Sequence, residues 1–129
     1  MHNHINLRIG DKLVQQKMGG LWQHVGVVIG PDCVLHNTLE KGEHSTTVTD
    51  FSGGKPFQVV ETDADPVTVV TRARKILANP QTYGVFTRNC EDTVYEVLIG
   101  KPVSPQGQTI IIVGLCLAFG AFFLSQRSK

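Results

Sequence analysis

A cysteine at the start of a predicted helix is the residue best placed to do chemistry in this sequence. Residues 90–99 read as a helix because Asn89 is a good N-cap residue and Gly100 ends the segment. A thiol at a helix N-terminus lies near unpaired backbone N–H groups, which favour the nucleophilic thiolate. The two acidic residues that follow Cys90 oppose this effect. The pattern therefore predicts a nucleophile that needs a nearby imidazole.

Two histidines on neighbouring predicted strands are the candidate partners of Cys90. Residues 21–29 carry the strongest strand pattern of the chain, and residues 32–36 follow a tight turn, so an antiparallel hairpin is expected. Opposite residues on such strands lie ~5 Å apart, which can bring His24 and His36 onto one face. His24 would act as general base and acid, and His36 would orient it.

The elements that must position these residues are short. The predicted order is strands, a helix, a loop and the cysteine helix, which indicates an α+β fold with a small antiparallel sheet packed against that helix. A polar, exposed connection is expected at residues 39–47, with His44 in solvent. Further strands are expected at residues 9–15, 46–51 and 57–61, and a helix capped by Asp65 is expected to end at Asn79.

The C-terminal segment differs from the rest of the chain. Residues 110–124 contain no charged or strongly polar side chain, and as a helix they would span roughly 22 Å, short of the ~30 Å of a bilayer core. Flanking residues extend the run, so a transmembrane helix is expected at residues 109–125. Residues 101–108 would form a linker, and residues 1–100 the catalytic domain.

Composition excludes several classes of protein. The 129 residues have a formal net charge of +1 and no basic stripe, which argues against a nucleic-acid partner. The three cysteines form no CxxC pair, so Cys33 and Cys116 are expected to be structural. His24, His36, Cys33 and Cys90 are zinc-ligand types, but their spacing matches no zinc motif. No metal and no cofactor are expected.

Three motifs together resemble the lecithin:retinol acyltransferase (LRAT) family. They are HVGVVIG preceded by Trp22 and Gln23, then VLH with its histidine twelve residues after the first, then RNCEDTVYEVLIG. Their order and spacing look like the H-Ras-like suppressor branch, which contains phospholipase A and acyltransferase enzymes. That branch belongs to the NlpC-type, circularly permuted papain-like superfamily. The resemblance runs from about Gly10 to the C-terminal tail.

The resemblance implies a role for each candidate residue. Cys90 would be the nucleophile that forms an acyl thioester, His24 its base and His36 the third member. Apart from the resemblance, the backbone N–H of Cys90 at the helix start is the natural donor to the oxyanion, with Gln23 or Trp22 as a further candidate. The family's His-Phe after Cys-Glu is replaced by Asp92-Thr93 here, which leaves the acyl donor and acceptor open.

The expected function is therefore that of a membrane-anchored thiol acyltransferase or phospholipase A acting on glycerophospholipids. Its partners would be the phospholipid membrane and its lipid substrate, with the catalytic domain on the cytoplasmic side of a single C-terminal anchor. Two alternatives stay open at this point: an NlpC-type cysteine peptidase or amidase, which shares the same chemistry, and a catalytically silent, membrane-tethered interaction protein.

Overall fold

The fold is built on one antiparallel sheet of five strands. The structure, a computed structural model, describes residues 6–84 and 88–102. The strand order across the sheet is β4-β3-β2-β1-β5, and each neighbouring pair is antiparallel. The strands are β1 (Lys12–Lys17), β2 (Trp22–Gly30), β3 (Cys33–Thr38), β4 (Gly42–Thr46) and β5 (Gln58–Val60).

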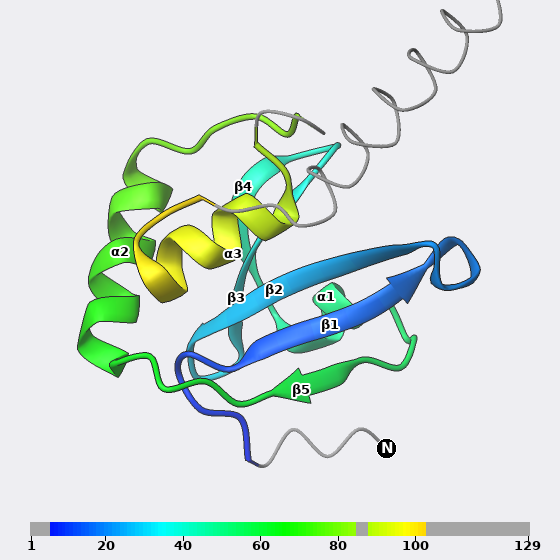
Figure 1. Ribbon diagram of the computed structural model, residues 1–129, viewed down its shortest axis with the longest axis horizontal. Helices are drawn as coiled ribbons and strands as arrows, with labels where there is room; N and C mark the ends of the chain where they lie inside the picture. The colour runs from blue at the N-terminus through cyan, green and yellow to red at the C-terminus, as the bar shows by residue number, and fades with distance from the viewer. Residues whose placement is uncertain (1–5, 85–87, 103–129) are drawn as a thin grey trace, which may run out of the picture.

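Helices cover both faces of this sheet. Helices α2 (Pro66–Ala78) and α3 (Cys90–Ile99) pack on one face, and the short helix α1 (Val48–Ser52) packs on the other (Figure 1). A 3₁₀ turn (Met18–Gly20) joins β1 to β2. Because two helices lie on one side and one on the other, the sheet separates two apolar clusters.

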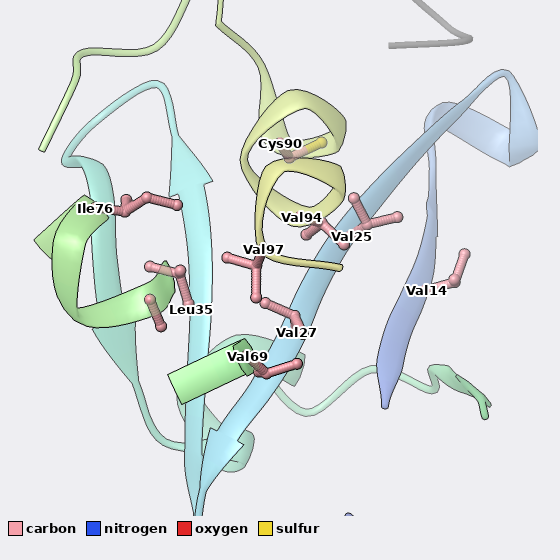
Figure 2. Packing of buried hydrophobic residues seen from close by; sticks show 10 residues of the cluster. Val14, Val25, Val27, Leu35, Val69, Ile76, Cys90, Val94 and Val97 are labelled. Atoms are coloured by element: carbon pink, nitrogen blue, oxygen red, sulfur yellow. The ribbon is translucent and has the colours of Figure 1, made fainter. Parts of the chain in front are cut away.

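The larger cluster joins the sheet to α2 and α3. Its sheet residues alternate along the strands, as Val25 and Val27 do on β2, and its helix residues recur at helical spacing, as Val94 and Val97 do on α3 (Figure 2). Cys90 belongs to this cluster and has no exposed surface. The first turn of α3 is therefore anchored against the strand that carries His24.

The smaller cluster lies on the opposite face of the sheet, around Phe51 of α1. Gly26 of β2 faces this cluster, and a Cβ there would lie 2.7 Å from a methyl group of Val34 and 2.8 Å from the Phe51 ring. Only glycine leaves room for that ring against the strand. Since His24 lies two residues before Gly26 on the same face, Phe51 also becomes its neighbour.

The structure confirms the predicted α+β class, hairpin and caps. Strands β2 and β3 form the expected antiparallel pair. Asp65 caps α2 and accepts from the Thr68 N–H, as predicted from the Asp-Pro start. Asn89 caps α3 within a capping box completed by Asp92, and Gly100 ends the helix in the left-handed conformation. Strands were also correctly predicted near residues 9–15 and 57–61.

Two predictions between residues 39 and 51 were wrong. The expected exposed connection at residues 39–47 contains strand β4, which pairs with β3 in full register. The strand expected at residues 46–51 is helix α1, because Thr47 caps it and accepts from the Asp50 N–H. In so short a segment, the alternating apolar pattern of a strand cannot be distinguished from the pattern of a single helical turn.

The C-terminal predictions lie mostly outside the described residues. Within those residues, no helix combines the length and the apolar composition needed to cross a bilayer. The transmembrane helix expected at residues 109–125, and most of the linker at residues 101–108, fall in the part of the chain that the structure does not describe. Both remain predictions, as does the boundary of the catalytic domain at residue 100.

Candidate active site

The Cys90 side chain lies at an edge of β2 that β3 leaves open. Strand β2 begins at Trp22, but among the described residues its register with β3 begins only at Gly26. The first turn of α3 occupies this opening. The Cys90 Sγ atom lies 3.7 Å from the backbone oxygen of Gln23, to which the thiol donates, and the Val25 N–H also faces the sulfur. The thiol is thus held between backbone groups on either side of His24.

The surroundings of Cys90 keep its proton on sulfur. Burial raises the pKa of the Cys90 thiol to about 11, and the Glu91 carboxylate acts in the same direction. Backbone N–H groups of Val25, Glu91 and Cys90 itself oppose the rise, but they do not outweigh it. The predicted activation by the helix N-terminus is therefore present and too weak to yield a thiolate at neutral pH.

His24 and His36 are hydrogen-bonded to one another. The Nε2 atom of His24 lies 2.9 Å from the Nδ1 atom of His36, with the ring centroids 5.2 Å apart. Phe51 stacks on the His24 ring at 5.3 Å and meets the His36 ring edge-on at 5.5 Å. The predicted pairing of the two histidines is what the structure shows, and the aromatic ring of α1 holds both imidazoles in place.

Both histidines are neutral at physiological pH. Burial, helped by Lys17 and His44, lowers the pKa of His24 to about 4. Burial, followed by the neighbouring His24 and His44 rings and by Lys41, lowers the pKa of His36 to about 3. A neutral imidazole has one nitrogen that can accept a proton, which is the form that a general base needs.

A third histidine extends this pair. The Nε2 atom of His44 lies 2.9 Å from the Nε2 atom of His36, and the His44 Nδ1 atom lies 2.8 Å from the Gly42 carbonyl oxygen. His36 and His44 are direct partners across β3 and β4. His44 was expected in a solvated loop, and that prediction was wrong.

A hairpin signal in the sequence could have located His44. Three residues, 39–41, separate two short segments, and a glycine follows them at position 42, which is typical of a hairpin connection. Pairing the segments around that turn places His44 opposite His36. Gly42 has a φ of 67°, and a Cβ there would lie 2.7 Å from the Gln81 carbonyl oxygen, so this turn requires glycine.

Cys90 lies against the backbone beside His24, but the side chains of these two described residues do not form a hydrogen bond with one another. Among the described residues, the His24 ring bonds to His36 through Nε2, and no hydrogen bond is recorded at its Nδ1 atom. The His24 ring lies on the Phe51 face of the sheet, whereas Cys90 packs with the α2–α3 cluster. The opening between β2 and β3 is where the two faces meet.

Other predicted features of the site have a defined place. The backbone carbonyl oxygen of Gln23 accepts from the Cys90 thiol, and the role of Gln23 as a further oxyanion donor stays a prediction. The Val25 N–H, not considered from the sequence, faces the sulfur from the same strand edge. No group of three or more potential metal ligands is arranged to hold a metal ion within the described residues.

Comparison with known proteins places this geometry in a family. No curated protein sequence matches the chain. The sequence model described as lecithin retinol acyltransferase matches residues 5–103, more than three quarters of the chain, including all of the candidate site. Proteins of this family are typically enzymes, with activities of the acyltransferase and phospholipase type. The chain belongs to the lecithin retinol acyltransferase family.

Proposed function

We propose that the protein is a membrane-anchored thiol acyltransferase or phospholipase A that transfers acyl chains of glycerophospholipids through a thioester on Cys90. The observation that carries the proposal is the position of the Cys90 thiol, 3.7 Å from the backbone oxygen of the residue before His24. The family match and the paired imidazoles of His24 and His36 support it.

The first half-reaction begins from a neutral Cys90 thiol and a neutral His24 imidazole. The Cys90 thiol turns from the Gln23 carbonyl oxygen toward the Nδ1 atom of His24, which takes the proton as the sulfur attacks the ester carbonyl carbon. The carbon–oxygen ester bond then breaks. The His24 imidazolium returns the proton to the departing alkoxide, and a lysophospholipid leaves with the acyl chain held as a thioester on Cys90.

The second half-reaction releases the acyl chain. Water, in a hydrolase, or an amine or alcohol, in a transferase, gives a proton to His24 Nδ1 and attacks the thioester carbon. The carbon–sulfur bond breaks, and the proton moves from His24 to the Cys90 sulfur. Backbone N–H groups of Cys90 and Val25 are the proposed donors to the oxyanion of both tetrahedral intermediates, because both face the sulfur.

The membrane part of the proposal depends on the sequence. Residues 110–124 form an uncharged apolar run that would hold the site at the surface of its substrate, as a single C-terminal anchor. By family resemblance, the catalytic domain would face the cytoplasm.

The test uses the full-length protein in mixed micelles of detergent and phosphatidylcholine, with and without phosphatidylethanolamine as an amine acceptor. Cys90→Ser and His24→Ala serve as comparison variants, and mass spectrometry follows both lipids and protein. We expect free fatty acid or N-acyl product, an acyl adduct on Cys90 that Cys90→Ser lacks, and a loss of about 10²-fold or more in His24→Ala.

Two results would redirect the proposal. If no lipid turns over but Cys90 still forms an acyl adduct with an activated amide, the substrate is of the peptide or amide class. If Cys90 forms no acyl adduct with any of these donors, the enzyme assignment fails and a role in interaction is left.

A further inference from the structure

We infer that His44 is a positioning residue of this site, which holds His24, through His36, in the tautomer whose Nδ1 atom can take the proton of Cys90. The inference depends on the proposed role of His24 as the base. It gives a function to His44, which the sequence analysis placed in a solvated loop.

The Gly42 carbonyl oxygen is the starting point, because a carbonyl oxygen can only accept hydrogen bonds. The Nδ1 atom of His44 lies 2.8 Å from this oxygen, so it must carry a hydrogen. A neutral imidazole has a single N–H. The Nε2 atom of a neutral His44 is therefore left with a lone pair, and it can only accept.

The same reasoning passes along the other two rings. His44 Nε2 accepts, so the Nε2 atom of His36, 2.9 Å away, must donate. The Nδ1 atom of the neutral His36 is then an acceptor, and the Nε2 atom of His24, also 2.9 Å away, must donate to it. The Nδ1 atom of His24 is left with the lone pair that a base requires.

The direction of the hydrogen bonds through the three histidines decides whether His24 can act as a base. If the His44 Nε2 atom carried the hydrogen instead, His36 would have to accept there and donate from Nδ1. The Nε2 atom of His24 would then accept, and its Nδ1 atom would already be protonated. Such a base cannot take the thiol proton, since a triad histidine held in the wrong tautomer loses most of its activity.

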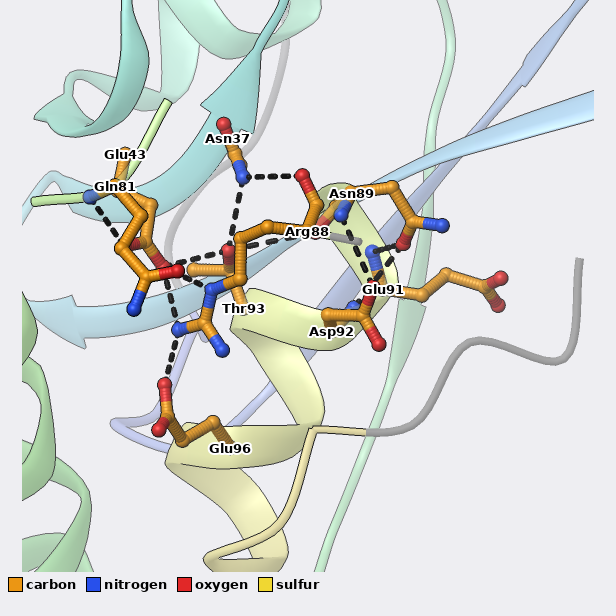
Figure 3. Close-up of polar contacts among 9 residues, drawn as sticks. All are labelled: Asn37, Glu43, Gln81, Arg88, Asn89, Glu91, Asp92, Thr93 and Glu96. Atoms are coloured by element: carbon orange, nitrogen blue, oxygen red, sulfur yellow. Dashed lines mark hydrogen bonds and ion pairs between the residues drawn. The ribbon is translucent and has the colours of Figure 1, made fainter. Parts of the chain in front are cut away.

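Buried contacts fix the strand that carries His44. Residue Glu43 is 3% exposed, and its carboxylate accepts from Arg88 at 2.6 Å, from the Thr93 hydroxyl at 2.7 Å and from the Gln81 N–H at 2.8 Å (Figure 3). Arg88 precedes the N-cap of α3 by one residue. The network thus ties β4 to the segment that leads into Cys90, which keeps His44 in register with His36.

Tautomers can be read directly by nitrogen NMR. The full-length protein in detergent micelles is labelled with ¹⁵N-histidine, and long-range ¹H–¹⁵N spectra at neutral pH are assigned with single histidine-to-glutamine variants. We expect protonated Nε2 in His24 and His36, and protonated Nδ1 in His44. A His44 protonated at Nε2, or at both nitrogens, overturns the inference, as does a His24 protonated at Nδ1 alone.

Variants at residue 44 test the consequence for His24. Glutamine offers a carbonyl oxygen at about the reach of the imidazole Nε2 atom, so His44→Gln is expected to keep the His24 tautomer. His44→Leu removes the acceptor. His44→Lys replaces the acceptor with a donor, which is expected to reverse the direction of the hydrogen bonds between His36 and His24. Ser45→Ala, at the exposed neighbour on β4, is the matched control.

Kinetics in mixed micelles give the second measurement. We expect His44→Leu to lower kcat by about 10- to 100-fold and His44→Lys by more, with KM nearly unchanged and His44→Gln within about threefold of the native protein. Equal losses in His44→Gln and His44→Leu would overturn the positioning role. If the tautomers are as expected but no acyl donor is turned over, the proposed function fails while the tautomer assignment stands.

Discussion

The pKa values of Cys90 and His24 are displaced in opposite directions, and both displacements favour the neutral side chain. Burial is the first cause for each group, because removing water penalises the charged form of a thiol as much as that of an imidazole. The resting site therefore holds a thiol and an imidazole, not a thiolate–imidazolium ion pair. His24 must act as a base during the attack itself.

The pH dependence of Cys90 alkylation tests this conclusion. We expect the rate constant with iodoacetamide, followed by mass spectrometry of the Cys90 peptide, to rise about tenfold per pH unit from about pH 6 to about pH 9, because only the thiolate reacts. Glu91→Gln should raise the rate throughout this range, because the Glu91 carboxylate raises the pKa of the thiol. A plateau that begins near pH 5 would instead indicate a preformed ion pair.

At the scale of elements, β4 and α3 are joined by a buried ionic network. The Arg88 side chain is 7% exposed and contacts the carboxylates of both Glu43 and Glu96, of which only Glu43 is fully enclosed (Figure 3). Asn37 of β3 donates to the Arg88 carbonyl oxygen and to the Thr93 hydroxyl. Three elements and the segment before the nucleophile thus meet at one set of polar side chains.

Breaking this network should destabilise the protein. We expect Glu43→Gln to lower the free energy of unfolding by about 3 kcal/mol, because it removes the enclosed carboxylate that pairs with the buried Arg88 guanidinium and leaves only Glu96, which is half-buried. Urea unfolding at neutral pH measures the change. Glu40→Gln, at an exposed site in the turn before β4, is the control and should change stability by less than about 0.5 kcal/mol. If Glu43→Gln lowers the free energy of unfolding by no more than Glu40→Gln does, the network adds nothing to stability.

The sequence predicted those elements whose signals are local. Asp65 before Pro66 and Asn89 before Cys90 are capping residues, and the helices begin where these residues indicate. The pairing of His24 with His36 followed from one strong hairpin. In contrast, β4 is polar on its outer face, and its buried residues are Gly42, which usually signals a turn, and Glu43, a type that is usually exposed.

The part of the site on β4 was not predicted for the same reason. Glu43 is buried only because Arg88, 45 residues away, neutralises it, and no local pattern reports such a partner. Without β4 there was no cross-strand partner for His36, so His44 was assigned to solvent. The opening between β2 and β3 is likewise a property of two strands and a helix together, which a period-two pattern cannot predict.

At the scale of the whole molecule, the site lies where the two apolar clusters meet. The sheet separates the cluster around Cys90 from the cluster around Phe51, and the open edge of β2 connects them. This arrangement buries the nucleophile and the base from opposite sides. The same burial that keeps both groups neutral couples the folding of the molecule to pH.

Mild acid should destabilise the fold, because His24 and His36 take up protons more readily in the unfolded chain. The folded-state pKa values of His24 and His36, about 4 and about 3, lie below the value of 6.5 for an unfolded chain. Between these values the unfolded state binds more protons, so stability is complete above about pH 7 and falls as the pH is lowered. For His24 alone, the loss from pH 7.5 to pH 5 is about 2 kcal/mol.

Urea unfolding of the full-length protein in micelles at these two pH values measures the loss. The variant His24→Gln/His36→Gln lacks both imidazoles and should show a much smaller decrease over the same range, whatever its absolute stability. The double variant keeps every Asp and Glu side chain, so the difference between the two proteins reports the two histidines. A native protein whose unfolding free energy stays constant or rises between pH 7.5 and pH 5 would contradict the burial of neutral imidazoles. It would also remove the basis for a chain of neutral tautomers running from Gly42 to His24.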